Sequence, residues 1–278
     1  TTIAHSGVLP HFPQLDGTDR HLWYGWRQGE ARDLDRLARR MPRSVRFVSE
    51  FGTESVPTTA PFLDEQLKTN RWPDLDWDDL EKRYGYHREL IESQFPPSDF
   101  ATFDDWRSTL QEYQSYVLRV QVETLRRLKY RPTGGFCFSS LADPAPNVSA
   151  SILDHERTPK DAYVTVQAAC AAVIIVADLP PDWVNPGDTL HLDVHIVNDR
   201  REPIDDARVD VTANWAGGSA TWAFGGPIEA DGVAKIGVVA MTIPDTLGEL
   251  AIELVAIDTD GAPLARNRYT TAVTLPPD

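Results

Sequence analysis

The chain has 278 residues, of which 41% are hydrophobic and 25% are charged. These proportions are ordinary for a folded globular protein, so they exclude disorder for the chain as a whole, and the length allows two domains of common size. The net charge of −15 predicts a surface that repels phosphate backbones and anionic lipid, so we expect neither nucleic acid nor a membrane as a partner. The longest apolar run, residues 168–177, is too short to cross a bilayer.

Residues 1–172 alternate short apolar strands with helical stretches. We expect strands at residues 2–5, 20–24, 45–48 and 136–138, and helices at residues 30–40, 61–67, 79–95, 103–128 and 159–170. The clearest helix is 103–128, where apolar side chains recur every three or four residues and Thr102 and Asp105 have the spacing of a capping box. Strands that alternate with helices predict a parallel sheet.

The pattern changes at residue 173, where short alternating runs begin and no helix is expected. These runs cover residues 173–177, 190–197, 208–215, 234–241, 249–257 and 270–275, and turn-forming Gly, Pro, Asn and Asp residues separate them. Residues 173–278 are therefore predicted to form an immunoglobulin-like β-sandwich domain. The fold class expected for the whole chain is α/β followed by all-β.

Neither the two cysteines nor the two strand histidines predict a disulfide framework or a metal site. Cys137 and Cys170 are outside any Cys-x-x-Cys pair, and we expect both to be buried as small hydrophobic residues. His191 and His195 share one face of a strand, but they lie about 13 Å apart along it, which is too far to chelate one ion. No metal site, no cofactor and no phosphate-binding loop is predicted.

The strongest local signal for chemistry is Ser49-Glu50-Phe51-Gly52, at the end of the strand predicted at residues 45–48. A carboxylate at the carboxyl end of a buried strand is where enzymes built on parallel barrels place catalytic groups. The alternative is a structural acid held in a salt bridge at the strand end. A buried charge is costly unless it is paired with another charge or serves in catalysis, and each interpretation meets one of these conditions.

Ser49-Glu50-Phe51-Gly52 resembles the nucleophile motif of glycoside hydrolase family 2. Two further segments resemble the β-mannosidase branch of that family in the same order: residues 20–26, rich in His and Trp, and residues 135–146, which continue through 148–160. The resemblance covers most of residues 1–170. It implies that residues 1–172 are the C-terminal half of a (β/α)8 TIM barrel, strands five to eight, and that the sandwich follows it.

The resemblance also implies an activity, that of a retaining β-glycosidase that hydrolyses O-glycosidic bonds of β-linked sugars, with Glu50 as the nucleophile. His21, Trp23, Trp26 and Asp143 are the residues expected to bind the carbohydrate substrate. For Trp23 and Trp26 the alternative is packing in the core, and for His21 it is capping a strand end.

A second carboxyl group, the acid/base, is required by the same mechanism. The family places it after an Asn on the fourth barrel strand, roughly 90 residues before the nucleophile, and no Asn-Glu pair occurs in this chain. We therefore expect the acid/base to be missing and the isolated chain to be inactive, with Glu54 and Asp143 in structural or substrate-positioning roles. The chain opens at Thr1 within a predicted strand, so we expect a processed or truncated chain.

Three departures from the family pattern favour an alternative. Ser139, Ala142 and Ala145 stand where the family has Trp, Asn and Trp. The alternative is a degenerate, non-catalytic half-barrel that binds glycans or acts as a scaffold beside an adhesive β-sandwich. A third interpretation is an unrelated α/β domain with an immunoglobulin-like module. Since half a barrel exposes unpaired strand edges, we expect self-association or pairing with the missing N-terminal half. The sequence does not indicate a cellular compartment.

Overall fold

A computed structural model describes residues 19–275 of the chain. The contacts within these residues divide them into two compact units, residues 19–125 with 130–169, and residues 126–129 with 170–275. The strand predicted at residues 2–5 lies outside the described residues. The chain thus combines a unit of mixed helix and strand with a unit of strands alone, as the predicted α/β and all-β classes require.

The first unit contains a small parallel sheet. Its strands are β1 (Arg20–His21), β2 (Phe47–Glu50) and β3 (Gly135–Phe136), and they lie in chain order. The helices of the unit are α1 (Asp33–Arg40), η1 (Pro42–Val45), α2 (Pro61–Thr69), α3 (Trp77–Tyr84), α4 (Arg88–Gln94), η2 (Pro97–Asp99), α5 (Phe103–Arg127) and α6 (Asp161–Ala169). Helices therefore join each parallel strand to the next, which is the crossover that parallel pairing requires.

The strands are shorter than, or shifted from, those predicted. Residue 45, expected in a strand, ends the short helix η1 that Pro42 begins, and β2 starts two residues later. β1 stops at His21 because the chain then turns at Trp23, whose carbonyl accepts hydrogen bonds from three of the following backbone amides.

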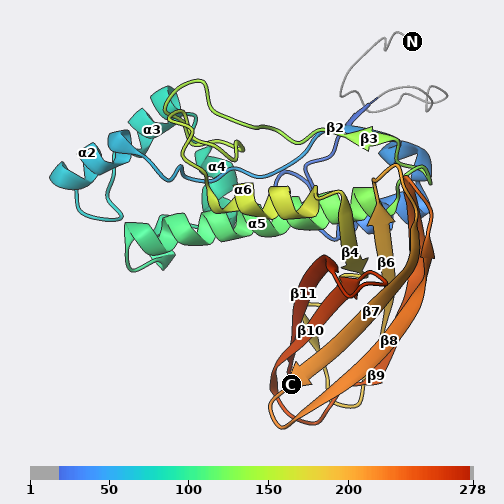
Figure 1. Cartoon of the computed structure of the whole chain (residues 1–278). Helices are drawn as coiled ribbons and strands as arrows, with labels where there is room; N and C mark the ends of the chain where they lie inside the picture. The colour runs from blue at the N-terminus through green and yellow to red at the C-terminus, as the bar shows by residue number, and fades with distance from the viewer. Residues whose placement is uncertain (1–18, 276–278) are drawn as a thin grey trace. The chain divides into compact units, whose positions relative to one another are not determined.

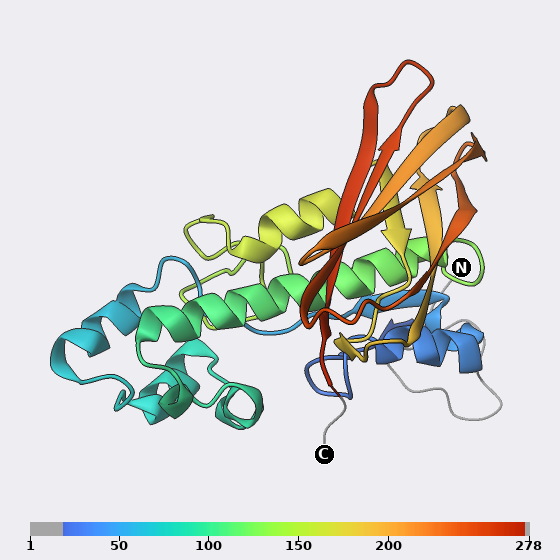
Figure 2. The same ribbon diagram turned by 90° about the horizontal axis from the view of Figure 1, so that it is seen from below.

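The long helix α5 organises the first unit. Half of its predicted capping box is present, since the Asp105 amide donates to Thr102 Oγ1 at 3.1 Å. The Asp105 carboxylate accepts from the Thr102 hydroxyl at 2.7 Å, where a full box would use the Thr102 backbone amide. α6 lies along α5 in both ribbon views, and α2, α3 and α4 gather near the start of α5 (Figures 1 and 2). There Trp106 of α5 is the centre of an aromatic cluster, whose other members are Trp72, Trp77, Tyr86 and Phe103.

The helix predicted over residues 79–95 is two helices, so that prediction is wrong in its extent. α3 ends at Gly85, which adopts a left-handed conformation with φ 65° and whose amide bonds to the Leu80 carbonyl. Glycine takes this conformation without the steric cost that a Cβ would add. The next helix, α4, begins after His87.

Replacing Gly85 by alanine is expected to lower the free energy of unfolding by about 1–2 kcal/mol, because the left-handed conformation costs about that much for a residue with a Cβ and because the Asn147 side chain must move away from the added Cβ. Gly134→Ala is the matched control: its φ is outside the left-handed region, and its added Cβ would lie 3.6 Å from the nearest atom. Urea denaturation of both variants measures the difference. Equal losses of stability would contradict the role given to Gly85.

The second unit is a two-sheet sandwich. One sheet has five strands in the order β5-β11-β10-β7-β8, and the other has three in the order β4-β6-β9. The strands are β4 (Val173–Ala177), β5 (Trp183–Val184), β6 (Thr189–Asn198), β7 (Ile204–Trp215), β8 (Gly218–Ile228), β9 (Gly232–Thr242), β10 (Gly248–Ile257) and β11 (Pro263–Val273). Inward-facing side chains of both sheets form one buried apolar core, which includes Val194, Val211 and Leu254.

Three features of the second unit were not predicted: the short strand β5, the strand β8 and the early start of β11. β8 contains three glycines and Pro227, residue types that are unfavourable in strands, although Trp222 and Phe224 alternate with exposed residues along it. The strand expected at residues 270–275 begins earlier, at Pro263, and pairs with β10 over most of its length.

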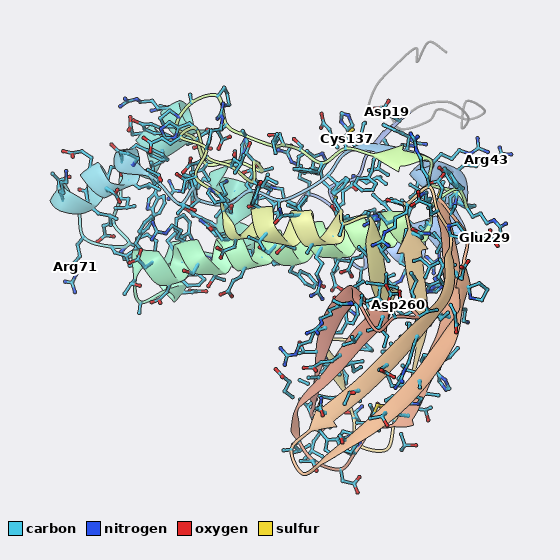
Figure 3. All side chains as sticks on the ribbon, in the orientation of Figure 1. Asp19, Arg43, Arg71, Cys137, Glu229 and Asp260 are labelled. Carbon is cyan, nitrogen blue, oxygen red and sulfur yellow. The ribbon has the colours of Figure 1, made fainter. Side chains whose placement is uncertain are left out.

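The expectation that both cysteines are buried is wrong. Cys137 is exposed just after β3, beside the small parallel sheet (Figure 3), and Cys170 is exposed just after α6. Cys137 follows two half-buried residues of β3 and Cys170 follows the buried Ala169, so apolar neighbours in the sequence did not place either cysteine in the core. Within residues 19–275 no helix is long and apolar enough to span a membrane.

Candidate functional site

Glu50 lies at the carboxyl end of β2, opposite His21 at the carboxyl end of β1. The two strands are parallel neighbours, and the Leu22 amide donates to the Glu50 carbonyl at 2.9 Å. This register brings His21 Nδ1 to 3.1 Å from Glu50 Oε2. The Glu50 side chain is 43% exposed, so its carboxylate is accessible while the histidine holds its orientation.

The glycine of the Ser-Glu-Phe-Gly motif allows the backbone after Glu50 to approach the loop after β3. Gly52 has φ 138°, and a Cβ there would lie 3.1 Å from the Ser139 carbonyl oxygen. The Ser139 amide donates to the Phe51 carbonyl at 2.9 Å, and the Phe51 ring is buried. The motif therefore fixes the loop after β2 against the loop after β3, directly beside Glu50.

A fully buried lysine ties the same two loops together further along. Lys160 is 1% exposed, and its ammonium group donates to the Ser55 and Ser149 carbonyls at 3.0 Å each. Ser55 and Ser149 also pair through their backbones. The side-chain amide of Gln114 joins the same two loops, because it donates to the Thr53 and Ala150 carbonyls at 2.9 and 3.1 Å.

Three buried carboxylates surround Lys160. Asp154 accepts backbone N–H groups from Thr59, Glu156 and Thr158 at 2.8 to 3.1 Å. Burial lowers the pKa of Lys160 to about 8, although the charges of Asp143, Asp154 and Glu54 oppose this shift. Desolvation of an ammonium group favours its neutral form, and here it outweighs the attraction of the three acids.

Asp143, predicted to bind substrate, belongs to this buried network. Its Oδ1 accepts from the Ser149 hydroxyl at 2.7 Å, and its Oδ2 is buried with no hydrogen-bond partner in the described part of the chain. No hydrogen bond or ion pair joins Asp143 to Glu50 within residues 19–275. Asp143 therefore contacts the loops that carry the site, and His21 is the predicted residue that contacts Glu50 itself.

Glu54 is the next acidic residue after Glu50 in the chain, and unlike Glu50 it is buried. Its Oε1 lies 2.7 Å from His87 Nδ1 and 3.6 Å from a terminal nitrogen of Arg27. Its Oε2 is buried without a hydrogen-bond partner in the described residues. The contact with Arg27 shows that the loops after β1 and β2 stay side by side beyond the ends of these strands.

The two predicted tryptophans have different environments. Trp26 is 4% exposed and packs in the aromatic core of the first unit, so neither face of its ring is open. Trp23 is half-buried at the edge of that core, and the Arg27 guanidinium carbon lies 5.2 Å from the centre of its ring. Of the two, only Trp23 is partly exposed, and Arg27 lies over its ring.

Sequence reasoning missed Arg27, His87 and Lys160 and gave Glu54 only a minor role. No local pattern marks a buried lysine, and His87 is 33 residues from Glu54 in the chain. The proximity of Glu54 to the Ser-Glu-Phe-Gly motif was the one signal available. Within the described residues, no group of three or more His, Cys, Asp or Glu side chains is arranged to hold a metal ion.

No protein-family model and no curated protein matches the sequence. Solved structures do match the fold. A β-D-mannosidase from Dictyoglomus thermophilum is similar with a TM-score of 0.70 and 20% identity, over 93% of this chain and 31% of that one. The exo-chitosanase CsxA from Amycolatopsis orientalis is similar with a TM-score of 0.61 and 16% identity, over 83% of this chain and 28% of that one. The chain thus shares its fold with about a third of the length of each.

Proposed function

We propose that this chain is part of a retaining β-glycosidase, β-mannosidase-like, in which Glu50 is the nucleophile. The observation that carries the proposal is the accessible Glu50 carboxylate at the carboxyl end of a parallel strand, oriented by His21 at 3.1 Å. The shared fold with a β-mannosidase and an exo-chitosanase supports it. The motif around Glu50 supports the same assignment independently.

In this proposal residues 1–172 form the second half of a (β/α)8 barrel, and residues 173–278 form an immunoglobulin-like domain. Three parallel strands in chain order, joined by helices, support the half-barrel. The fraction of the two solved glycosidases that the chain matches, 31% and 28%, is in keeping with a partial barrel plus one further domain. The other half-barrel would pair with the open edge of the small sheet.

The reaction would proceed in two steps. The Glu50 carboxylate attacks the anomeric carbon of a β-glycoside as the leaving group departs, which forms a glycosyl-enzyme, and water then releases the sugar. A second carboxyl group about 5–5.5 Å from Glu50 must protonate the leaving oxygen and later activate the water. We assign that group to the other half of the barrel, because Glu54 is buried and held by His87 and Arg27.

A fluoride leaving group needs little help from an acid, so a 2-deoxy-2-fluoro-β-mannosyl fluoride tests the nucleophile directly. We expect the full-length protein to gain the mass of one fluorosugar on the peptide that contains Glu50. Glu50→Gln is expected to abolish the labelling, while Glu65→Gln, on the exposed surface of α2, leaves it unchanged. Labelling of another residue, or labelling that persists in Glu50→Gln, would rule out this assignment.

The small side chains of the loop after β3 favour one second candidate, a glycan-binding module without hydrolysis. Ala145 is exposed and Ser139 half-buried, and neither offers the aromatic surface that sugars usually contact. Binding of a β-mannoside that survives Glu50→Gln, together with no labelling of the full-length protein, would establish this second function.

A further inference from the structure

The pairing of β1 with β2 shifts its register directly beside Glu50. Arg20 of β1 lies opposite Val48 of β2. The next residue of β1, His21, lies opposite Glu50, so one step along β1 corresponds to two steps along β2. Ser49 is therefore the extra residue of β2, without an opposite residue in β1. An extra residue of this kind is a β-bulge, and a bulge changes the direction of the side chains around it.

The bulge brings two consecutive side chains of β2 against β1. The Ser49 hydroxyl donates to the Asp19 carboxylate. The Glu50 carboxylate lies 3.1 Å from His21 Nδ1. In a regular strand the side chains of Ser49 and Glu50 would point to opposite faces of the sheet, whereas residues two apart, such as Asp19 and His21, point to the same face. A regular β2 could thus supply one of these two contacts, and the bulged strand supplies both.

Asp19 is a firm point of attachment for the bulge. It directly precedes β1 at the small sheet (Figure 3) and is 4% exposed. A carboxylate out of water is costly unless other groups use its charge, and a hydrogen bond that it accepts there is stronger than one in water. The Ser49 hydroxyl also lies 3.4 Å from the Arg20 carbonyl oxygen, so it is directed at the backbone of β1 as well.

We infer that Ser49 and Asp19 are positioning residues for Glu50: the hydrogen bond between them holds the bulge, and the bulge directs the Glu50 carboxylate toward His21. Both act on Glu50 through the backbone of β2. The Glu50 side chain is 43% exposed, so its orientation depends on the strand that carries it and on His21. The consequence for catalysis rests on the proposed function, whereas the geometry of the bulge does not.

The geometry is tested on the chain labelled with ¹⁵N-histidine, in which His21→Gln identifies the ring resonances of His21. Ser49→Ala removes the hydroxyl without changing any charge. We expect it to move the His21 resonances toward their positions in Glu50→Gln, in which the carboxylate is absent. Ser115→Ala is the matched control, since this half-buried serine donates to the Gln111 carbonyl at 3.0 Å within α5, and it should leave the resonances unchanged. Unchanged resonances in Ser49→Ala would overturn the inference.

The effect on the reaction is measured as the rate at which the fluorosugar labels Glu50 in the full-length protein. Ser49→Ala is expected to slow labelling about tenfold at saturating reagent, because a small misplacement of a reacting group is costly. The reagent concentration that gives half the maximal rate should stay the same. Ser49→Thr keeps the hydroxyl and is expected to label at nearly the wild-type rate. A folding defect would lower the fraction of protein that is labelled, not the rate constant of the folded fraction. A wild-type rate in Ser49→Ala would overturn the role in the reaction.

Asp19→Asn tests whether Asp19 is the partner through which Ser49 acts. The amide oxygen still accepts from the hydroxyl, but a hydrogen bond to a neutral acceptor is about half as strong as one to a carboxylate. In this background Ser49→Ala is therefore expected to slow labelling only about threefold. Equal effects in the two backgrounds would remove Asp19 from the inference. If the wild type is never labelled at Glu50, the proposed hydrolysis fails, while the His21 resonances still decide whether Ser49 positions Glu50.

Discussion

Replacing Trp106 by alanine is expected to lower the free energy of unfolding of the first unit by about 3–5 kcal/mol, the usual cost of truncating a buried tryptophan. Trp106 is 1% exposed, and its indole N–H donates to the Phe95 carbonyl at 3.0 Å. Its ring lies 5.4 Å from Trp72, 5.8 Å from Trp77 and 6.2 Å from Tyr86, measured between ring centres. Truncation would remove all these contacts and leave the carbonyl without its donor.

The matched control for this prediction is Trp183→Ala. Trp183 is 52% exposed on β5, so the same chemical change there is expected to cost less than about 1 kcal/mol. Urea denaturation followed by tryptophan fluorescence measures both variants and shows which transition belongs to the first unit. Equal losses of stability in the two variants would contradict the central place given to Trp106. Because Tyr86 precedes His87 in the chain, the Trp106 variant should also disturb the contact between His87 and Glu54.

The stability of the first unit is expected to rise with pH above pH 8, through Lys160. Burial lowers the pKa of Lys160 to about 8 from an ordinary value of 10.5. Between these two values the unfolded chain holds a proton that the folded chain has released, so raising the pH favours the folded state. A pKa shift of this size raises the free energy of unfolding by about 3 kcal/mol in all. About 2 kcal/mol of this rise occurs between pH 7 and pH 9.5.

The measurement compares the wild type with Lys160→Met. The difference between their free energies of unfolding should change by about 2 kcal/mol from pH 7 to pH 9.5, in favour of the wild type. Measurements should stop near pH 10, because burial raises the pKa of Tyr86, and raises that of Tyr113 to about 12, and each adds an opposite slope at higher pH. Lys82→Met, at an exposed position of α3, should keep the wild-type profile. Parallel profiles for the wild type and Lys160→Met would contradict the prediction.

Sequence reasoning succeeded where a pattern repeats along the chain. The apolar stripe of α5 recurs over seven turns, and its Thr102 cap marks the start, so this helix was predicted closely. Six of the eight strands of the second unit were predicted for the same reason, and β5 and β8 were not. Glu50 was singled out because a strand end and a short motif coincide there, and the structure places it at the end of β2 beside His21.

The remaining features depend on residues that are far apart in the chain. Lys160 is buried because Ser55 and Ser149 turn their carbonyls toward it, and the sequence around Pro159 gives no sign of this. Arg27, His87 and Glu54 meet only when the loops after β1 and β2 and the segment before α4 come together. Gly85 interrupts a helical pattern that is continuous in apolar spacing, and only its left-handed backbone shows that α3 stops there.

The order of strands in the sandwich has a consequence for synthesis of the chain. β11, the last strand described, lies between β10 and β5, and its residues 272 and 273 pair in parallel with residues 183 and 184. The five-stranded sheet therefore cannot close until residues 263–273 have left the ribosome. Contacts between segments so distant in sequence form slowly. During that interval β10 has an open edge. The contacts within residues 19–125 and 130–169 can already form, because all of these residues precede β11. The first unit can therefore fold before the five-stranded sheet is complete.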